Sequence, residues 1–154
     1  MEPIKLISTD TESPPLPVII SVWGEQYFDG CDPDGTELTT EGTLRPLPDG
    51  LLLRYEESAL TGMEGTVTTF ELRGEKVLLT RAGKVNSQMI FEEGRQHTSL
   101  YETPMGELSV DILTSFLRHS LTERGGLLEI RYSIAVDHTA TGKNAFKIRV
   151  RPKS

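Results

Sequence analysis

The chain has 154 residues, enough for one domain that buries about 70% of its unfolded surface without covalent cross-links. Cys31 is its single cysteine, which excludes an intramolecular disulfide and predicts a reducing compartment. The net charge is −7, divided into −10 over residues 1–65 and +3 over residues 66–154. Because an acidic chain repels phosphate backbones, we expect no nucleic acid among its partners.

The N-terminal segment, residues 1–17, is rich in Ser, Thr, Pro and acidic residues, a composition that predicts a flexible tail. It lacks the basic region and apolar stretch of a signal peptide. No segment approaches the ~20 consecutive apolar residues of a membrane helix. We therefore expect a cytoplasmic protein without membrane insertion, folded as a single domain over residues 18–154.

From Val18 onward, short runs of strand-forming residues alternate with turn-forming residues. Nine turn clusters separate the runs, which predicts about ten strands and an all-β fold. The clusters are DGCDPDG (29–35), RPLPDG (45–50), SALTGMEG (58–65), RGEK (73–76), RAGK (81–84), EEGR (92–95), TPMG (103–106), TERGG (122–126) and DHTATGKN (137–144).

Residues 112–121, ILTSFLRHSL, admit two interpretations: a single helical turn, or the continuation of a strand. Leu108, Val110, Ile112 and Phe116 share one parity, which is the two-residue period of a strand. The pattern favours the strand.

The last three predicted strands alternate most clearly, with apolar residues at every second position and polar residues between them. Such strands have one face on a core and one in water, as in antiparallel sheets. Short turns join them into a meander, and closing a meander into a barrel removes its free edges. We predict an antiparallel up-and-down β-barrel of eight to ten strands. The apolar sets are Leu108, Val110 and Ile112; Leu128, Ile130, Tyr132, Ile134 and Val136; and Phe146, Ile148 and Val150.

The charge distribution suggests which strands close the barrel. The first part of the chain is acidic, and the last strand is basic. Opposite charges on neighbouring strands stabilise their pairing. We therefore expect the first and last strands to pair.

The middle strands, Glu64–Leu72 and Asn86–Glu92, carry polar and apolar residues on both faces. An interior cavity of mixed chemistry explains this pattern, and so does an outer wall covered by a loop or a second subunit. Buried hydroxyl groups need each other, water or a ligand, so an interior with several of them favours a partly polar pocket. The polar residues in question are Thr66, Thr68, Ser87, His97, Ser99, Tyr101 and Thr103.

Six segments resemble an uncharacterised bacterial family of small β-barrels, the YwiB-like proteins, over roughly residues 18–151. They are RYEES (54–58), TGMEGTVTTFEL (61–72), LLTRAG (78–83), MIFEEG (89–94), YETPMGELSVDILT (101–114) and GGLLEIRYSI (125–134). The family is grouped with the calycins, the superfold of lipocalins and fatty-acid-binding proteins. The resemblance therefore implies a single calycin-like antiparallel barrel. It implies no catalytic residue, because the function of the family is undefined.

Arg81 shares the parity of Val77 and Leu79, so its side chain points inward if theirs do. A buried guanidinium needs a carboxylate or several carbonyl groups, and Glu57 is the candidate partner. One interpretation is an anion anchor, comparable to the arginine that holds a ligand carboxylate in fatty-acid-binding barrels. The other is a structural arginine that closes the barrel end, stacked on Trp23.

Three tyrosines and one histidine are further candidates for ligand contacts. Aromatic side chains with one polar tip line cavities well, although they also suit any half-buried pleated surface. The candidate ligand-binding residues are Tyr55, Arg81, His97, Tyr101 and Tyr132.

Other motifs predict no chemistry. In DGCDPDGTE (29–37) the glycine spacing does not fit an EF-hand, and the three histidines lack metal-ligand spacing. We find neither a Gly-x-Ser-x-Gly elbow nor a phosphate-binding loop. The last strand carries a basic row without interleaved aromatic residues, so we interpret it as a charged face that discourages edge pairing. The row consists of Lys147, Arg149, Arg151 and Lys153, with Arg131 nearby.

These observations predict a non-enzymatic barrel without metal or cofactor, monomeric or homodimeric, that binds a small amphipathic or anionic molecule in its interior. The alternative is a protein-interaction or assembly module whose barrel is filled by its own side chains. An interior of several hundred Å³ favours the first function. A filled interior with an exposed apolar patch favours the second.

Overall fold

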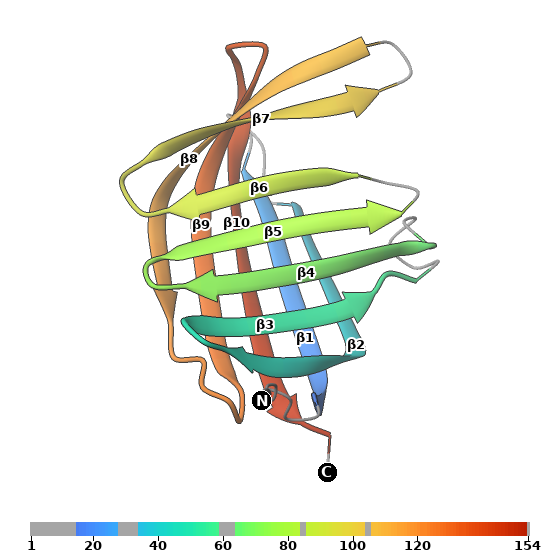
Figure 1. Ribbon diagram of the computed structural model, residues 1–154. Helices are drawn as coiled ribbons and strands as arrows, with labels where there is room; N and C mark the ends of the chain where they lie inside the picture. Colours follow the sequence, from blue (N-terminus) through green and yellow to red (C-terminus); the bar gives the residue numbers. More distant parts are fainter. Residues whose placement is uncertain (1–14, 28–33, 59–63, 84–85, 104–105, 154) are drawn as a thin grey trace, which may run out of the picture.

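A computed structural model describes residues 15–27, 34–58, 64–83, 86–103 and 106–153, which form ten antiparallel strands in one sheet (Figure 1). The all-β architecture and the predicted number of strands are confirmed. Residues 112–121 continue a strand up to His119, as the parity predicted. The strands are β1 (Leu16–Tyr27), β2 (Asp34–Leu47), β3 (Gly50–Glu56), β4 (Thr66–Arg73), β5 (Lys76–Gly83), β6 (Ser87–Glu92), β7 (Gln96–Thr103), β8 (Gly106–His119), β9 (Gly126–Val136) and β10 (Thr139–Pro152).

The strands form a meander that curls into a nearly closed barrel. Their order in the sheet is β6-β5-β4-β3-β2-β1-β10-β9-β8-β7, so strands that are consecutive in sequence lie side by side, except β6 and β7, and β1 lies beside β10. In Figure 1, β3 to β6 form a front layer that crosses the layer of β1, β2 and β8 to β10 behind it. β6 and β7 stand at the two ends of the order, and along the described residues no strand ladder joins them. A seam therefore remains between these two strands.

The predicted pairing of the first and last strands is confirmed, with a register that runs from Val18↔Pro152 to Tyr27↔Lys143. On the inner face, Val18 and Ile20 are fully buried. The charge argument behind the prediction is wrong, because the basic residues of β10 face uncharged residues of β1. Burial of the inner face and the backbone ladder hold the two strands together. The outer pairs are Ile19↔Arg151, Ser21↔Arg149 and Trp23↔Lys147.

A β-bulge in β8 overturns one predicted orientation. The register shifts between Thr114 and Phe116, so that Phe116 lies opposite Arg131, whereas Leu117 lies opposite Ile130. The extra residue reverses the parity of the rest of the strand. Phe116 therefore lies on the outer face, and Leu117 takes the inward position that the alternation had assigned to Phe116.

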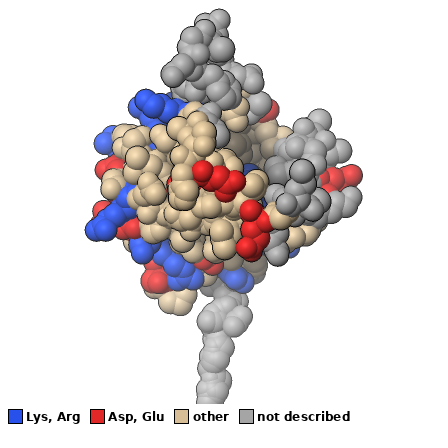
Figure 2. Space-filling model, turned by 90° about the horizontal axis from the view of Figure 1, so that it is seen from above, with Lys and Arg blue, Asp and Glu red and all other residues tan. Residues whose placement is uncertain are grey.

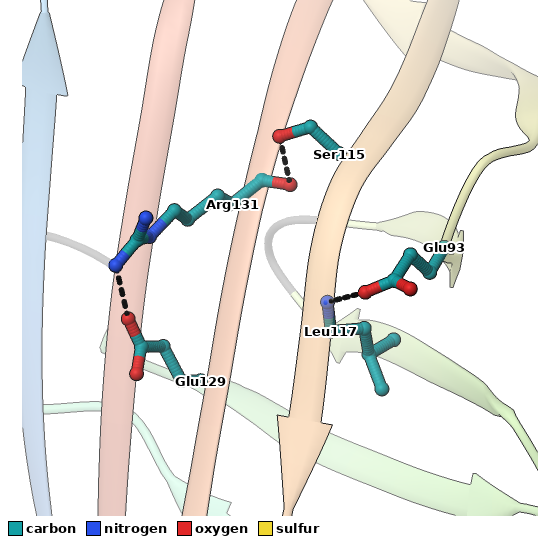
Figure 3. A network of polar contacts seen from close by, with 5 residues as sticks. All are labelled: Glu93, Ser115, Leu117, Glu129 and Arg131. Atoms are coloured by element: carbon teal, nitrogen blue, oxygen red, sulfur yellow. Dashed lines mark hydrogen bonds and ion pairs between the residues drawn. The ribbon is translucent and has the colours of Figure 1, made fainter.

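The bulge is held by the turn that connects β6 to β7. The Gly94 amide donates to the Thr114 carbonyl oxygen at 2.8 Å, and the Thr114 amide donates to the Arg95 carbonyl oxygen at 3.2 Å. Figure 3 shows two further bonds: the Leu117 amide to Glu93 Oε1 at 2.9 Å, and the Ser115 hydroxyl to the carbonyl oxygen of Arg131 at 3.2 Å. The bonds from Glu93, Gly94 and Arg95 attach the β6–β7 turn, at one end of the seam, to β8.

Five aromatic rings connect the two crossing layers in the core. Phe146 of β10 lies 6.0 Å from Phe70, 5.7 Å from Phe91 and 5.9 Å from Tyr132, measured between ring centroids. Tyr55 stacks on Phe70 at 6.5 Å. Edge-to-face pairs of this kind stabilise by about 0.5–1.5 kcal/mol beyond the area that they bury.

Two glycines permit the close approach of neighbouring strands. A Cβ atom at Gly42 would lie 2.3 Å from the Arg54 carbonyl oxygen and 2.7 Å from Ile20 Cδ1. At Gly83, which has a φ of +136°, a Cβ atom would lie 2.2 Å from the Gly65 carbonyl oxygen. The glycine of the RAG segment is thus required by the β4–β5 pairing.

Element boundaries differ from the prediction at both ends of the chain. β1 begins at Leu16, inside the segment that composition assigned to a tail, and residues 1–14 lie outside the described part, as do Cys31 and its loop. The turn predicted over residues 137–144 is shorter, because β10 begins at Thr139 and accommodates a bulge between Ala140 and Gly142. Asp137 and His138 form the turn with positive φ values of 49° and 67°.

Charge is distributed unevenly over the surface. Seen from above, uncharged residues make up most of the visible face, acidic side chains lie near its centre, and Lys and Arg side chains gather along one side with acidic residues between them (Figure 2). The described residues include no helix with the length and apolar composition needed to cross a membrane.

Removing the last strand should destroy the fold. A chain that ends at residue 143 lacks the segment of β10 that pairs with both β1 and β9, so it exposes two unpaired edges and opens the core. We expect no cooperative thermal unfolding by circular dichroism. A monomeric truncated chain with a sharp melting transition would contradict the closure described above.

Candidate functional site

The barrel encloses a cavity of about 860 Å³ that opens at the ends of β1, β2 and β10. Such a volume lies in the range of small-molecule sites, roughly 300–1,000 Å³. One part of the lining is apolar and aromatic: Val22, Leu38, Phe70, Leu79, Met89, Ala145 and Phe146. The polar part consists of Tyr55, Glu57, Arg81, Tyr132 and Asn144, and the exposed residues Glu25, Gln26 and Glu37 lie at the opening.

Arg81 and Glu57 meet inside the barrel, which confirms their predicted pairing. Arg81 Nε lies 3.9 Å from Glu57 Oε2; the Arg81 side chain is 24% exposed and that of Glu57 is 1% exposed. Glu57 follows the end of β3, where its amide donates to the Thr66 carbonyl oxygen at 2.9 Å and so extends the β3–β4 ladder. The Thr68 hydroxyl donates to the same carboxylate.

Trp23 does not stack on Arg81, so that part of the structural interpretation is wrong. Its indole Nε1 donates to Glu37 Oε2 at 2.6 Å, and the guanidinium of Arg149 lies 6.0 Å from the ring centroid. The reason is parity: the fully buried Val18 and Ile20 place the even-numbered residues of β1 inside, and Trp23 therefore lies outside.

The charge of Arg81 acts on all three predicted tyrosines. Burial raises the pKa of Tyr55 to about 12, and the carboxylate of Glu57 adds to this effect. Burial also raises the pKa of Tyr132 to about 12 and that of Tyr101 above its ordinary value. In all three cases the positive charge of Arg81 acts in the opposite direction, so its guanidinium lies within electrostatic reach of each phenol.

Two polar atoms in this region lack a hydrogen-bond partner within the described part of the chain, namely Arg81 Nε and Tyr101 Oη. Both are buried. Tyr101 occupies the inward position of β7 opposite Leu108, although it does not line the large cavity itself. Unpaired buried donors are unfavourable unless water or a ligand satisfies them. The arrangement can therefore accept a hydrogen-bond acceptor beside the ion pair.

His97 lies apart from the other predicted site residues. It faces inward opposite Ile112, but its Nε2 is 3.0 Å from Glu92 Oε1 at the turn between β6 and β7. This hydrogen bond lowers the pKa of the Glu92 carboxyl. The cavity lining does not include His97.

Tyr55, Arg81 and Tyr132 of the polar lining were predicted from the sequence, whereas most lining residues of β1, β2 and β10 were not. Thr66 and Thr68 are buried as expected, whereas the side chain of Thr103 lies outside the described residues. The alternation of the first strand would have pointed to Val22 and Gly24. Across the described ranges, no cluster of three or more His, Cys, Asp or Glu side chains could hold a metal ion.

The Arg81–Glu57 pair should contribute measurably to stability. Arg81→Met leaves the buried carboxylate of Glu57 without its cationic partner, so we expect a loss of about 1–3 kcal/mol in the free energy of unfolding. In urea titrations, the double variant with Glu57→Leu should recover much of this loss.

A surface pair provides the control for this cycle. Arg73 and Asp49 also form an ion pair, but their side chains are 40% and 64% exposed, so Arg73→Met should cost less than about 1 kcal/mol. Equal losses for Arg81→Met and Arg73→Met would show that Arg81 behaves as a surface residue.

The tyrosines predict a loss of stability at alkaline pH. In the unfolded chain a tyrosine ionises at about pH 10, whereas Tyr55 and Tyr132 in the fold have a pKa of about 12. Below about pH 10 both tyrosines are protonated in the folded and the unfolded state, and their full contribution to the free energy of unfolding is present. Above this pH the unfolded state releases protons that the folded state retains, and the free energy of unfolding falls by up to ~1.4 kcal/mol per pH unit per tyrosine.

Urea midpoints measured across this pH range should therefore fall steeply, and Tyr132→Phe should reduce the slope. Ultraviolet absorbance of the phenolate group in the folded protein provides the direct measurement. Ionisation of all its tyrosines at the ordinary pKa would contradict their burial.

Comparison with known proteins bears on the fold and family. A family described as a domain of unknown function (DUF1934) matches residues 20–148. Among solved structures, the crystal structure of the ywiB protein from Bacillus subtilis is similar with a TM-score of 0.76 at 22% identity, covering 91% of this chain and 94% of that chain. At this identity the likeness shows the fold alone. No curated protein matches the chain. The chain belongs to the DUF1934 family of domains of unknown function.

Proposed function

We propose that the protein is a non-enzymatic binding barrel that holds a small amphipathic molecule in its interior, with a hydrogen-bond-accepting or anionic head group beside Arg81. The observation that carries the proposal is the buried Nε of Arg81, which lacks a hydrogen-bond partner among the described residues, on a residue that lines an 860 Å³ cavity. A barrel filled by its own side chains would leave no such volume, so the cavity supports binding over the alternative of a filled interaction module.

The two ends of the cavity suit the two ends of an amphiphile. Leu79 and Met89 offer aliphatic surface, and Phe70 and Phe146 offer aromatic surface, to a hydrocarbon chain. The guanidinium of Arg81 offers charge-assisted hydrogen bonds, which are the strongest that a carboxylate can receive from a side chain. The hydroxyl of Tyr101 is a further unpaired donor in this region.

Neighbouring carboxylates limit the choice of head group. Glu57 already neutralises part of the charge of Arg81, and Glu25 and Glu37 lie at the opening. A single negative charge or an uncharged acceptor is therefore favoured over a multiply charged group such as a phosphate monoester. The rest of the binding energy would come from apolar burial, at roughly 0.8 kcal/mol per methylene group.

The test compares ligands that differ only in the head group. Dodecanoate, dodecanol and dodecylamine should each be titrated against the protein loaded with a dansyl fatty acid. We expect dodecanoate to displace the probe best and dodecylamine least. Arg81→Gln should weaken dodecanoate about tenfold and leave dodecanol within about twofold, because one charge-assisted hydrogen bond is worth about 1.5–3 kcal/mol.

Arg73→Gln provides the matched control, since it removes the same charge from the surface. It should leave all three affinities unchanged. If none of the three ligands displaces the probe, or if Arg81→Gln weakens all three equally, the proposal fails. A function in protein interaction would then replace it.

A further inference from the structure

The outer face of β9, β10 and β1 carries a groove of about 710 Å³, which shares Glu25, Ala145 and Phe146 with the lining of the cavity but does not include Arg81. Its floor includes Ala145, whose small side chain leaves space between larger neighbours. Leu127 borders the groove and is 48% exposed, which is unusual for a large apolar residue. The remaining lining residues are Trp23, Glu25, Glu129, Arg131, Phe146, Lys147 and Arg149.

Three arginines around this groove are positioned by aromatic rings. The guanidinium of Arg149 lies 6.0 Å from the centroid of the Trp23 ring, while those of Arg118 and Arg131 lie 5.3 Å and 4.9 Å from that of Phe116. A guanidinium that rests on an aromatic face keeps the N–H donors of its edge available for a carboxylate. The bulge in β8 creates this arrangement, because it turns Phe116 outward beside Arg131.

Most of the positive charge on this face is not neutralised within the protein. Arg131 pairs with Glu129 at 2.9 Å (Figure 3), and Lys153 at the end of β10 pairs with Glu41 at 2.8 Å. Among the residues that the structure describes, no carboxylate forms an ion pair with the other four cations of the face. These are Arg118, Lys147, Arg149 and Arg151, all of them exposed.

We propose that this face binds an acidic protein segment that inserts one large apolar side chain into the groove over Ala145 and places carboxylates on Arg118 and Arg149. Alternate residues of β10 lie about 6.8 Å apart, the same spacing as alternate side chains of an extended peptide. Trp and Arg are the residue types that most often dominate the energy of protein interfaces. The groove supplies the apolar centre, and the four cations supply the charged rim.

Two observations favour a protein segment over nucleic acid. Besides the acidic net charge, nucleic acid was disfavoured because no aromatic residues alternate with the basic row, and that second reason does not hold, since Trp23 and Phe116 lie on the same face. Their rings, however, are already occupied by guanidinium groups and offer no free stacking platform. Glu25 and Glu129 also line the groove, and the whole chain carries a net charge of −7, which repels a polyanion at long range.

The experiment uses two short fluorescein-labelled peptides of glutamate residues, one with a central tryptophan and one with serine in its place, and a single-stranded oligothymidine. Fluorescence anisotropy should show saturable binding of the tryptophan peptide that weakens with salt. Its affinity should exceed that of the serine peptide about tenfold. Arg118→Glu combined with Arg149→Glu should weaken the tryptophan peptide by at least about tenfold.

Two further variants distinguish binding in the groove from non-specific electrostatic attraction. Arg45→Glu combined with Arg54→Glu makes the same change in net charge at exposed positions of β2 and β3, and should alter the affinity less than about twofold. Ala145→Leu fills the groove and should remove the preference for the tryptophan peptide. The two double variants should keep the thermal midpoint of the unmodified protein and its dodecanoate binding, since none of their four arginines lines the cavity.

Three outcomes would overturn the proposal: no saturable peptide binding, equal losses in the two double variants, or binding of oligothymidine in place of the peptides. The last outcome would assign the face to nucleic acid. None of these outcomes affects the Arg81 site, which is tested by different ligands.

Discussion

The ladder between β1 and β10 is the contact on which the rest of the structure depends. It joins residues that are more than a hundred positions apart in the chain, and it is what turns a meander of local hairpins into a barrel with an interior. Loop closure over such a length is entropically costly. The opposing contribution comes from the inner face, where residues such as Ile20, Ile148 and Val150 are almost completely removed from water.

The pairing of β1 with β10 also determines which strands remain at the edges of the sheet. With β1 and β10 paired, the free edges fall at β6 and β7, and their connecting turn bonds to the bulge of β8 instead of extending a ladder. Tyr101 lies on one of these edge strands, and Arg81 lies on the strand next to the other. The buried donors without partners in this region are therefore a consequence of how the sheet ends. A fully closed sheet would bring more backbone partners to the same place.

The strands of the back layer carry two different surfaces because side chains alternate along a strand. Inward residues of β9 and β10, such as Tyr132 and Phe146, border the cavity, while their outward neighbours, such as Arg131 and Lys147, surround the outer groove. The bulge at Thr114 changes this assignment within a single strand. The bulge places the ring of Phe116 on the outer face, where the guanidinium of Arg131 lies over it.

The amino-acid sequence by itself determined the all-β class, the approximate number of strands, the inward faces of β9 and β10, and the partnership of Arg81 with Glu57, because two-residue alternation and turn chemistry are local properties. The sequence did not predict that Phe116 faces outward, since a bulge inserts one residue without a clear local signal. Nor did it predict that His97 lies outside the cavity, bonded to Glu92 at the β6–β7 turn. The cause predicted for the pairing of β1 with β10 was also wrong. Burial of Val18 and Ile20 stabilises this pairing, whereas the expected attraction between opposite charges is absent from the paired residues. Only the tertiary structure decided the cavity, the seam and the outer groove, because each depends on which distant strands meet, and that choice is made by the summed burial of the whole sheet.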